Sequence, residues 1–144
     1  MLEKNLIEPF IKSTEWAAYG ASLLRGKNDK IAADKAAVDE MRNELNKINM
    51  KGTIVIGEGE MDDAPMLYIN EKVGTNIGIE FDIAVDPLEG TNFTANNLPN
   101  AGLISIVITF QTYHIKYPIP NAIITGNPNS PMAAANLLQP INLS

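Results

Sequence analysis

The stretch that most constrains this chain runs from residue 82 to residue 92, because it begins as a strand and ends as an acidic turn. Ile83 and Val85 are β-branched residues in alternation, which suits a half-buried strand. Pro87 is expected to stop the pairing, because proline has no N–H to donate to a ladder. A strand that delivers polar side chains to its carboxyl end predicts a ligand site at that edge of an α/β sheet.

The residues just beyond the predicted strand have the chemistry of a cation site. Asp86 and Glu89 supply carboxylate oxygens, which are the ligands that hard divalent cations prefer. Gly90 lets the backbone come close to a ligand, and Thr91 can present a hydroxyl oxygen next to it. The stretch therefore predicts a site for a hard cation and for a group that the cation binds.

Helical periodicity singles out another acid, Asp34. A first helix is expected over residues 3–24 and a second over about residues 30–48, capped by Asn28 or Asp29. Asp34 lies in line with the apolar stripe of the second helix, where an acid is costly unless it is paired or bound to metal. The alternative is a solvated acid at the start of the stripe, or one paired with Lys30 or Lys35. The stripe consists of Val38, Met41, Leu45 and Ile48.

Glu58 repeats the pattern of a strand followed by an acid. A short strand is expected over residues 53–56, and it runs directly into Gly57-Glu58-Gly59-Glu60. The two glycines give the backbone around Glu58 conformations that are closed to other residues. Periodicity and spacing leave two interpretations open, a metal ligand and an acidic surface turn.

Composition narrows the classes of function. The net charge of −6 argues against general binding of nucleic acids or anionic membranes, although metal ions can still bring phosphates to an acidic protein. The chain has no cysteine, which excludes disulfides and Cys-ligated zinc, so Mg²⁺ or Mn²⁺ is the expected metal. The polar start and the lack of an apolar run long enough to cross a bilayer predict a cytoplasmic protein.

Charge divides the chain into two parts. All acidic residues lie in the first 100 positions, and Lys116 is the only charged residue from Ala101 to Ser144. Soluble surfaces are normally charged and mixed, so this change predicts a boundary. We expect residues 1–107 to carry the metal site and residues 108–144 to form a divergent tail. The tail is interpreted as a poorly ordered end, a frameshifted translation, or a segment that needs a partner.

Three motifs in order resemble one family. Residues 86–91 read Asp-Pro-Leu-Glu-Gly-Thr, which matches the Asp-Pro-x-Asp/Glu-Gly-Thr signature of the lithium-sensitive, metal-dependent sugar-phosphatase superfamily. Residues 52–75 and residues 29–42 are similar to the class II (GlpX-type) fructose-1,6-bisphosphatases within that superfamily. The resemblance covers about residues 3–101. It implies an α/β (α+β) layered sugar-phosphatase fold, here its N-terminal half only, with two N-terminal helices packed on a mixed β-sheet.

The resemblance implies a role for each matching residue. Asp34, Glu58, Asp86 and Glu89 fall on the family's metal ligands, with Mg²⁺ or Mn²⁺ as the implied ion. Thr91 falls on the threonine that activates the attacking water, and Glu58 is grouped with it as catalytic. Glu89, Gly90 and Thr91 match the stretch that contacts the substrate phosphate. The implied reaction is release of the 1-phosphate of fructose 1,6-bisphosphate in gluconeogenesis and glycerol metabolism, with sedoheptulose 1,7-bisphosphate as a further substrate.

The chain departs from the family in length. Family members are more than twice as long, and their second half supplies another metal-binding glutamate and most of the residues that hold the sugar. Two functional hypotheses therefore stand: a phosphatase acting on a small sugar bisphosphate, and a non-catalytic fragment that binds divalent metal or needs a partner chain. No nucleic-acid or membrane partner is expected, and the resemblance leaves a family-type homo-oligomer open.

Overall fold

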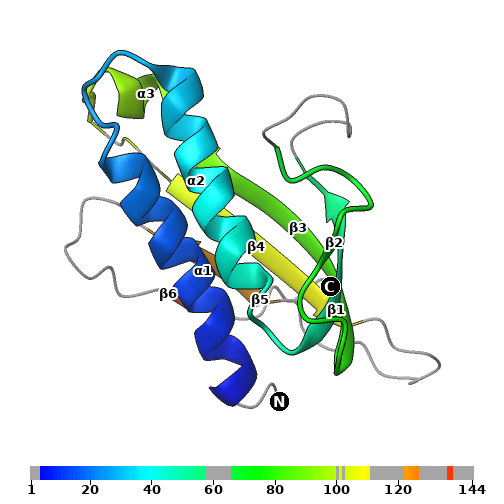
Figure 1. Cartoon of the computed structure of the whole chain (residues 1–144). Coiled ribbons are helices and arrows are strands. Elements are labelled where there is room, and N and C mark those ends of the chain that lie inside the picture. Colours follow the sequence, from blue (N-terminus) through cyan, green and yellow to red (C-terminus); the bar gives the residue numbers. More distant parts are fainter. Residues whose placement is uncertain are drawn as a thin grey trace, which may run out of the picture.

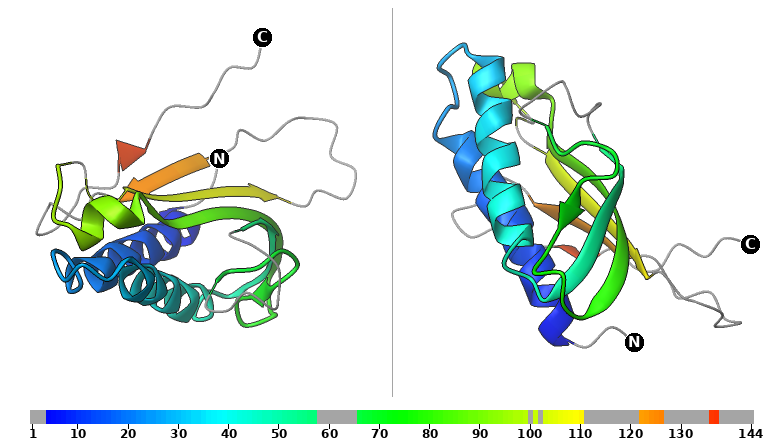
Figure 2. Two further views of the ribbon diagram at one scale, coloured as in Figure 1. Left: turned by 90° about the horizontal axis from the view of Figure 1, so that it is seen from above. Right: turned by 45° about the vertical axis from the view of Figure 1, so that its right-hand side comes forward.

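Two long helices lie side by side on one face of a sheet in the computed structural model of this chain, which describes residues 4–57, 66–99, 101, 103–110, 122–126 and 136–137. The helices are α1, Lys4–Ser22, and α2, Lys30–Leu45. Views from two further directions show that both helices cover the same side of the sheet (Figures 1 and 2). The predicted arrangement of two N-terminal helices packed on a mixed sheet is confirmed.

In the part of the chain that the structure describes, the sheet has six strands in the order β2-β1-β3-β4-β5-β6. β1 and β3 are parallel, and the other neighbouring strands pair antiparallel. The longest strand, β3, therefore lies inside the sheet with a partner along each side. The bounds are β1 Met50–Ile56, β2 Lys72–Val73, β3 Ile79–Glu89, β4 Leu103–Phe110, β5 Ala122–Gly126 and β6 Asn136–Leu137.

The core lies between the two helices and the sheet. Alternate residues of β3 point into it, and Phe81 packs edge-on against Phe10 of α1 with ring centroids 5.5 Å apart. The intervening residues Asp82 and Ala84 are partly exposed, which is the alternation expected of a strand with one buried face. The whole apolar stripe predicted for the second helix is buried: Val38, Met41, Leu45 and Ile48.

Single residues fix where α2 begins and how closely α1 approaches it. Asp29 is the N-cap of α2, and its Oδ1 accepts a hydrogen bond of 2.9 Å from the backbone N–H of Ala32. Gly20 lets α1 approach α2 closely, because a Cβ at this position would lie 2.8 Å from the carbonyl oxygen of Ala36.

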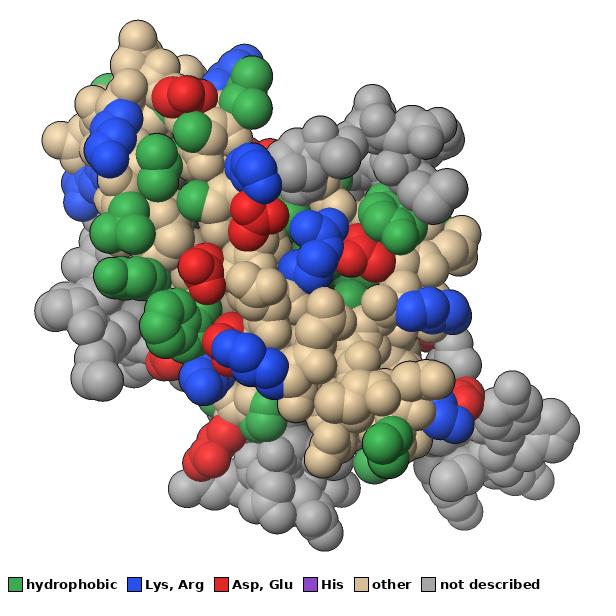
Figure 3. All heavy atoms as spheres, in the orientation of Figure 1, with side chains coloured by type: hydrophobic (Ala, Val, Ile, Leu, Met, Phe, Trp, Pro, Cys, Tyr) green, Lys and Arg blue, Asp and Glu red, His purple; other side chains and the backbone are tan. Residues whose placement is uncertain are grey.

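The outer surface over both helices mixes basic, acidic and apolar side chains (Figure 3). It includes the exposed aromatic pair Trp16 and Tyr19, whose ring centroids are 5.6 Å apart.

The sheet continues across the boundary that charge predicts at residues 107/108. β4 spans that position, and β5 and β6 lie in the charge-poor part and extend the sheet from β4. The division into a metal-binding part and a divergent tail stays a prediction. Among the helices that the structure describes, none is both long and apolar enough to cross a bilayer.

Candidate metal centre

The predicted stop at Pro87 is wrong in one respect, because β3 continues to Glu89. Asp86 pairs with Ser105 of β4, and the pairing resumes two residues along β4 but three residues along β3, where Glu89 lies opposite Leu103. The extra residue makes a bulge next to the proline, which cannot donate to the ladder. Asp86 is the last residue of β3 before the bulge, and Glu89 is the first paired residue after it.

A left-handed glycine turns the chain at the end of β3. Gly90 has φ +72° and ψ +46°, and it forms the N-cap of the short helix α3, Thr91–Ala95. Backbone N–H groups of Phe93 and Thr94 donate to the Gly90 carbonyl oxygen at 2.9 Å and 3.3 Å. This conformation is open to glycine without a steric penalty. The turn therefore places Thr91 directly beside Glu89 at the carboxyl end of the strand.

The start of α2 is held against α3 by backbone hydrogen bonds. The loop between the long helices donates from Gly26 N to the Thr94 carbonyl oxygen at 3.0 Å, and from Asn28 N to the Ala95 carbonyl oxygen at 2.8 Å. Both Gly26 and Asn28 have positive φ, so the loop turns tightly as it enters α2. These contacts bring the first turns of α2, which carry Asp34, to the carboxyl end of β3.

At this end of β3, Asp34 and Asp86 lie close enough for the charge of Asp86 to act on Asp34. Each side chain is half-buried, and Oδ1 of each is buried without a hydrogen-bond partner in the part of the chain that the structure describes. Lys35, one of the predicted partners of Asp34, instead donates to Asp39 at 2.6 Å. An unsatisfied buried carboxylate oxygen is costly. The two Oδ1 atoms are therefore free acceptors, and a bound cation would be a partner for both of them.

Burial and nearby negative charge both raise the pKa values of these two carboxyls. Desolvation raises the pKa of Asp34, and the negative charge of Asp86 raises it further. Desolvation also raises the pKa of Asp86, followed by the charge of Glu89, while a backbone hydrogen bond from Leu88 lowers it in part. A divalent cation would reverse these effects, because it stabilises the charged form of each carboxylate.

The remaining predicted site residues are placed as follows. Glu89 is exposed at the end of β3, and Thr91 is half-buried at the start of α3. Glu58 lies outside the described residues. Within the described ranges, no three His, Cys, Asp or Glu side chains form a complete metal-binding group. The structure thus brings together Asp34 and Asp86, with Glu89 acting electrostatically on Asp86.

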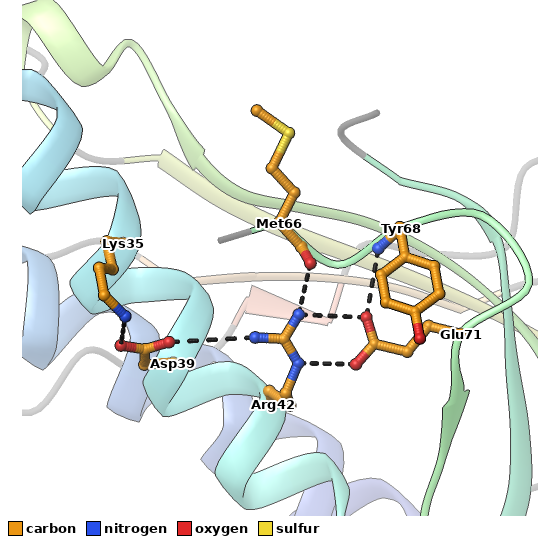
Figure 4. Close-up of polar contacts among 6 residues, drawn as sticks. All are labelled: Lys35, Asp39, Arg42, Met66, Tyr68 and Glu71. Carbon is orange, nitrogen blue, oxygen red and sulfur yellow. Dashed lines mark hydrogen bonds and ion pairs between the residues drawn. The ribbon is translucent and has the colours of Figure 1, made fainter. Parts of the chain in front are cut away.

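Sequence reasoning assigned no role to a second polar cluster, in which Arg42 of α2 contacts Met66 and Glu71 (Figure 4). Arg42 forms a two-pronged ion pair with Glu71, with Nε 2.6 Å from Oε1 and Nη2 3.1 Å from Oε2. The hydrogen bond to Glu71 raises the pKa of the Arg42 guanidinium, so the guanidinium stays charged. No local sequence pattern joins residues 29 positions apart, so nothing in the sequence indicated that Arg42 and Glu71 pair.

Comparison with known proteins matches the part of the chain that ends at residue 116 and so includes α1, α2 and strands β1 to β4. The model of the family described as "Bacterial fructose-1,6-bisphosphatase, glpX-encoded" matches residues 4–116. The chain is 54% identical over 100 residues to "Fructose-1,6-bisphosphatase 1 class 2" of Escherichia coli (strain K12), covering 69% of this chain and 30% of that protein. It is 53% identical over 94 residues to "D-fructose 1,6-bisphosphatase class 2/sedoheptulose 1,7-bisphosphatase" of a Synechococcus strain, covering 65% and 28%. The chain thus spans about 30% of the length of these relatives.

Proposed function

The chain belongs to the family of bacterial, glpX-encoded fructose-1,6-bisphosphatases, and from this premise we propose that it carries the metal-binding part of a sugar-bisphosphate phosphatase. The reaction is hydrolysis of the 1-phosphate of fructose 1,6-bisphosphate, a step of gluconeogenesis. The names of the cyanobacterial relatives extend the proposed substrates to sedoheptulose 1,7-bisphosphate.

The observation that carries the proposal is the pair of buried, unpartnered oxygens, Oδ1 of Asp34 and Oδ1 of Asp86. Carboxyls whose pKa values are raised by burial and by a neighbouring negative charge, as those of Asp34 and Asp86 are, fit a site that is completed by a cation. The donors are all oxygens, which suits Mg²⁺ or Mn²⁺. Asp34, Glu58, Asp86 and Glu89 would hold the ions.

Divalent cations held by these residues would supply activation of a water molecule and neutralisation of charge on the leaving oxygen. The side chains of this chain have separate tasks. Asp34 and Asp86 each keep one oxygen, Oδ1, unpaired for ligation, and Glu89 adds negative charge at the exposed rim of the site. The Thr91 hydroxyl, held at the start of α3, orients the attacking water. Gly90 leaves room for the phosphate to approach the backbone.

Phosphate release from fructose 1,6-bisphosphate tests the proposal directly. The purified chain is assayed with Mn²⁺ beside Thr91→Ala and Asp86→Asn, and Glu80→Gln serves as a control because Glu80 pairs with Lys51 elsewhere on the sheet. We expect release by the chain and by the control, and a loss of about 100-fold in both site variants. Equal release by the chain and Thr91→Ala would refute catalysis, and Mn²⁺ binding without release would leave a metal-binding fragment.

A further inference from the structure

A pocket opens on the face of the sheet that points away from α1 and α2, at the edge formed by β2. Its volume is about 490 Å³, and residues of β1, β2, β3 and the turn after β2 line it. Alternation along β1 places Met50, Gly52 and Ile54 in the core, and therefore Lys51 and Thr53 on the opposite face. β2 is the first strand of the sheet and pairs only with β1 among the described strands, so the pocket lies at a sheet edge (Figure 1).

Lys72 brings a positive charge to this pocket. Its Nζ donates to Oγ1 of Thr53 at 2.8 Å, directly across the β1–β2 pair. Among the residues that the structure describes, no carboxylate lies within ion-pair distance of Lys72. The acid opposite Thr53 in register is Asp82 of β3, on the side of β1 away from Lys72. The Lys72 ammonium keeps further donors for a ligand, and the Thr53 hydroxyl still has its own hydrogen to donate.

Lys51 lines the same pocket, on the diagonal from Lys72. Its ammonium lies 3.5 Å from Oε1 of Glu80, so these two charges balance and Lys72 leaves the pocket with an excess positive charge. The position across from Lys51 is Gly74, next in register after the last β1–β2 pair, and a glycine leaves that space open. Two lysines on a diagonal repel each other, and an anion between them would offset this repulsion.

We propose that this pocket binds a phosphate group, with Lys72, Lys51 and Thr53 as donors. Phosphate oxygens accept short, charge-assisted hydrogen bonds from ammonium groups, and hydroxyl and amide groups complete such sites. Asn76, which is exposed in the turn after β2 and also lines the pocket, carries an amide of this kind. The volume exceeds what a bare ion fills, so the phosphate group of a small ester fits there as well as free phosphate.

The pocket is separate from the candidate metal centre. Lys51 is paired in register with Glu80 near the start of β3, whereas Asp86 lies six residues further along the same strand. At about 3.3 Å per residue, the two places are about 20 Å apart. The phosphate site therefore needs no bound cation, and it does not rest on the proposed function.

NMR spectroscopy of amide proton–nitrogen correlations tests the site in the purified chain, kept metal-free with EDTA. Inorganic phosphate is titrated in one series and glycerol phosphate in another. We expect saturable shifts at the amides of Thr53, Lys72 and Gly74, which line the pocket. Tighter binding of the ester would identify a phosphorylated small molecule as the ligand, and tighter binding of inorganic phosphate would identify the free ion.

Three variants separate specific binding from general charge attraction. Lys72→Gln should raise the dissociation constant about tenfold, because it removes the excess positive charge of the pocket. Thr53→Val keeps the shape of the side chain but removes the hydroxyl, so it should raise the constant about threefold. Lys35→Gln is the matched control, because Lys35 is also an exposed lysine but pairs with Asp39 on α2. This control removes the same charge and should change the constant less than about 1.5-fold, since salt screens distant surface charges.

Three results would overturn the site. The first is the lack of any saturable shift below about 10 mM of either probe. The second is equal weakening in Lys35→Gln and Lys72→Gln, which would assign binding to general charge attraction. The third is a set of shifts confined to residues 90–94, which would place the phosphate at the turn before α3 instead. If Lys72→Gln does not fold, Thr53→Val decides. Mn²⁺ binding at Asp34 and Asp86 is measured separately, so failure of the phosphate site leaves the proposed function standing.

Discussion

Asp86→Asn should stabilise the metal-free chain and abolish its stabilisation by metal. The substitution removes a carboxylate that is desolvated and repelled by its neighbours, and Asp34 then ionises more easily. Because Asp86 is only half-buried, solvent screening limits the gain in the free energy of unfolding to about 1 kcal/mol at pH 8. For a chain of this size, that corresponds to an increase of about 2–4 °C in Tm.

Metal should reverse the order of stability. Mn²⁺ at about 100 times its dissociation constant adds about 2.7 kcal/mol to the wild-type chain by mass action, or roughly 5–10 °C in Tm. Asp86→Asn should gain less than about 1 °C, because a neutral amide replaces one of the two carboxylates that would bind the cation. Thermal unfolding followed by circular dichroism, with EDTA and with Mn²⁺, measures both effects.

The pH dependence follows from the direction of the pKa shifts. A carboxyl whose folded pKa is raised binds protons more tightly in the folded chain. The metal-free wild-type chain therefore loses stability as pH rises from the ordinary carboxyl range through the raised pKa. The advantage of Asp86→Asn should be present at pH 8 and shrink toward pH 4.

Glu80→Gln, on the same strand but outside the site, is the control for both conditions. It should follow the wild-type response to Mn²⁺ at every pH. A metal-free Asp86→Asn that is less stable than the wild type at pH 8, or one that retains the full Mn²⁺ response, would refute this account of the site.

Three further substitutions test the scaffold by urea unfolding. Gly57→Ala should cost about 1–3 kcal/mol, since its Cβ would collide with the Leu67 carbonyl oxygen, and wild-type stability would contradict that close approach. Asp29→Ala should cost about 1 kcal/mol, because the Ala32 N–H loses its cap, whereas Asp29→Asn should cost less than half of that. Phe10→Ala should cost about 3–5 kcal/mol through the cavity it leaves in the core, and a loss below about 1 kcal/mol would show that Phe10 is not packed as described.

Local features of the chain were the ones that sequence could predict. Periodicity of 3.6 located α2 and its buried stripe, and a cap next to its first turn located its start, because both signals act within a few residues. Alternation located β3 for the same reason. The continuation of β3 past Pro87 was missed, since a bulge depends on the register with β4, which is fixed by the rest of the sheet.

The candidate site was also predictable from the sequence only where its residues are close together in the chain. Asp86, Glu89 and Thr91 lie within six positions, so their shared location at the end of one strand was readable from the motif. Whether Asp34 was solvated, paired or brought to that strand depended on how the loop before α2 docks on α3. The pairing of Arg42 with Glu71 depended on the packing of α2 against a loop 29 residues away in the chain.

By itself, the sequence determined the types of element, the acids available and the family to which the chain belongs. These follow from local periodicity, from side-chain chemistry and from motifs held within short stretches. Only the tertiary structure decided what each acid lies next to: Asp34 lies near Asp86, each with one unpartnered oxygen, whereas Glu71 is paired with Arg42. The physical reason is that a carboxylate's pKa and partners are set by desolvation and by charges within a few ångströms, and chain folding alone fixes those distances.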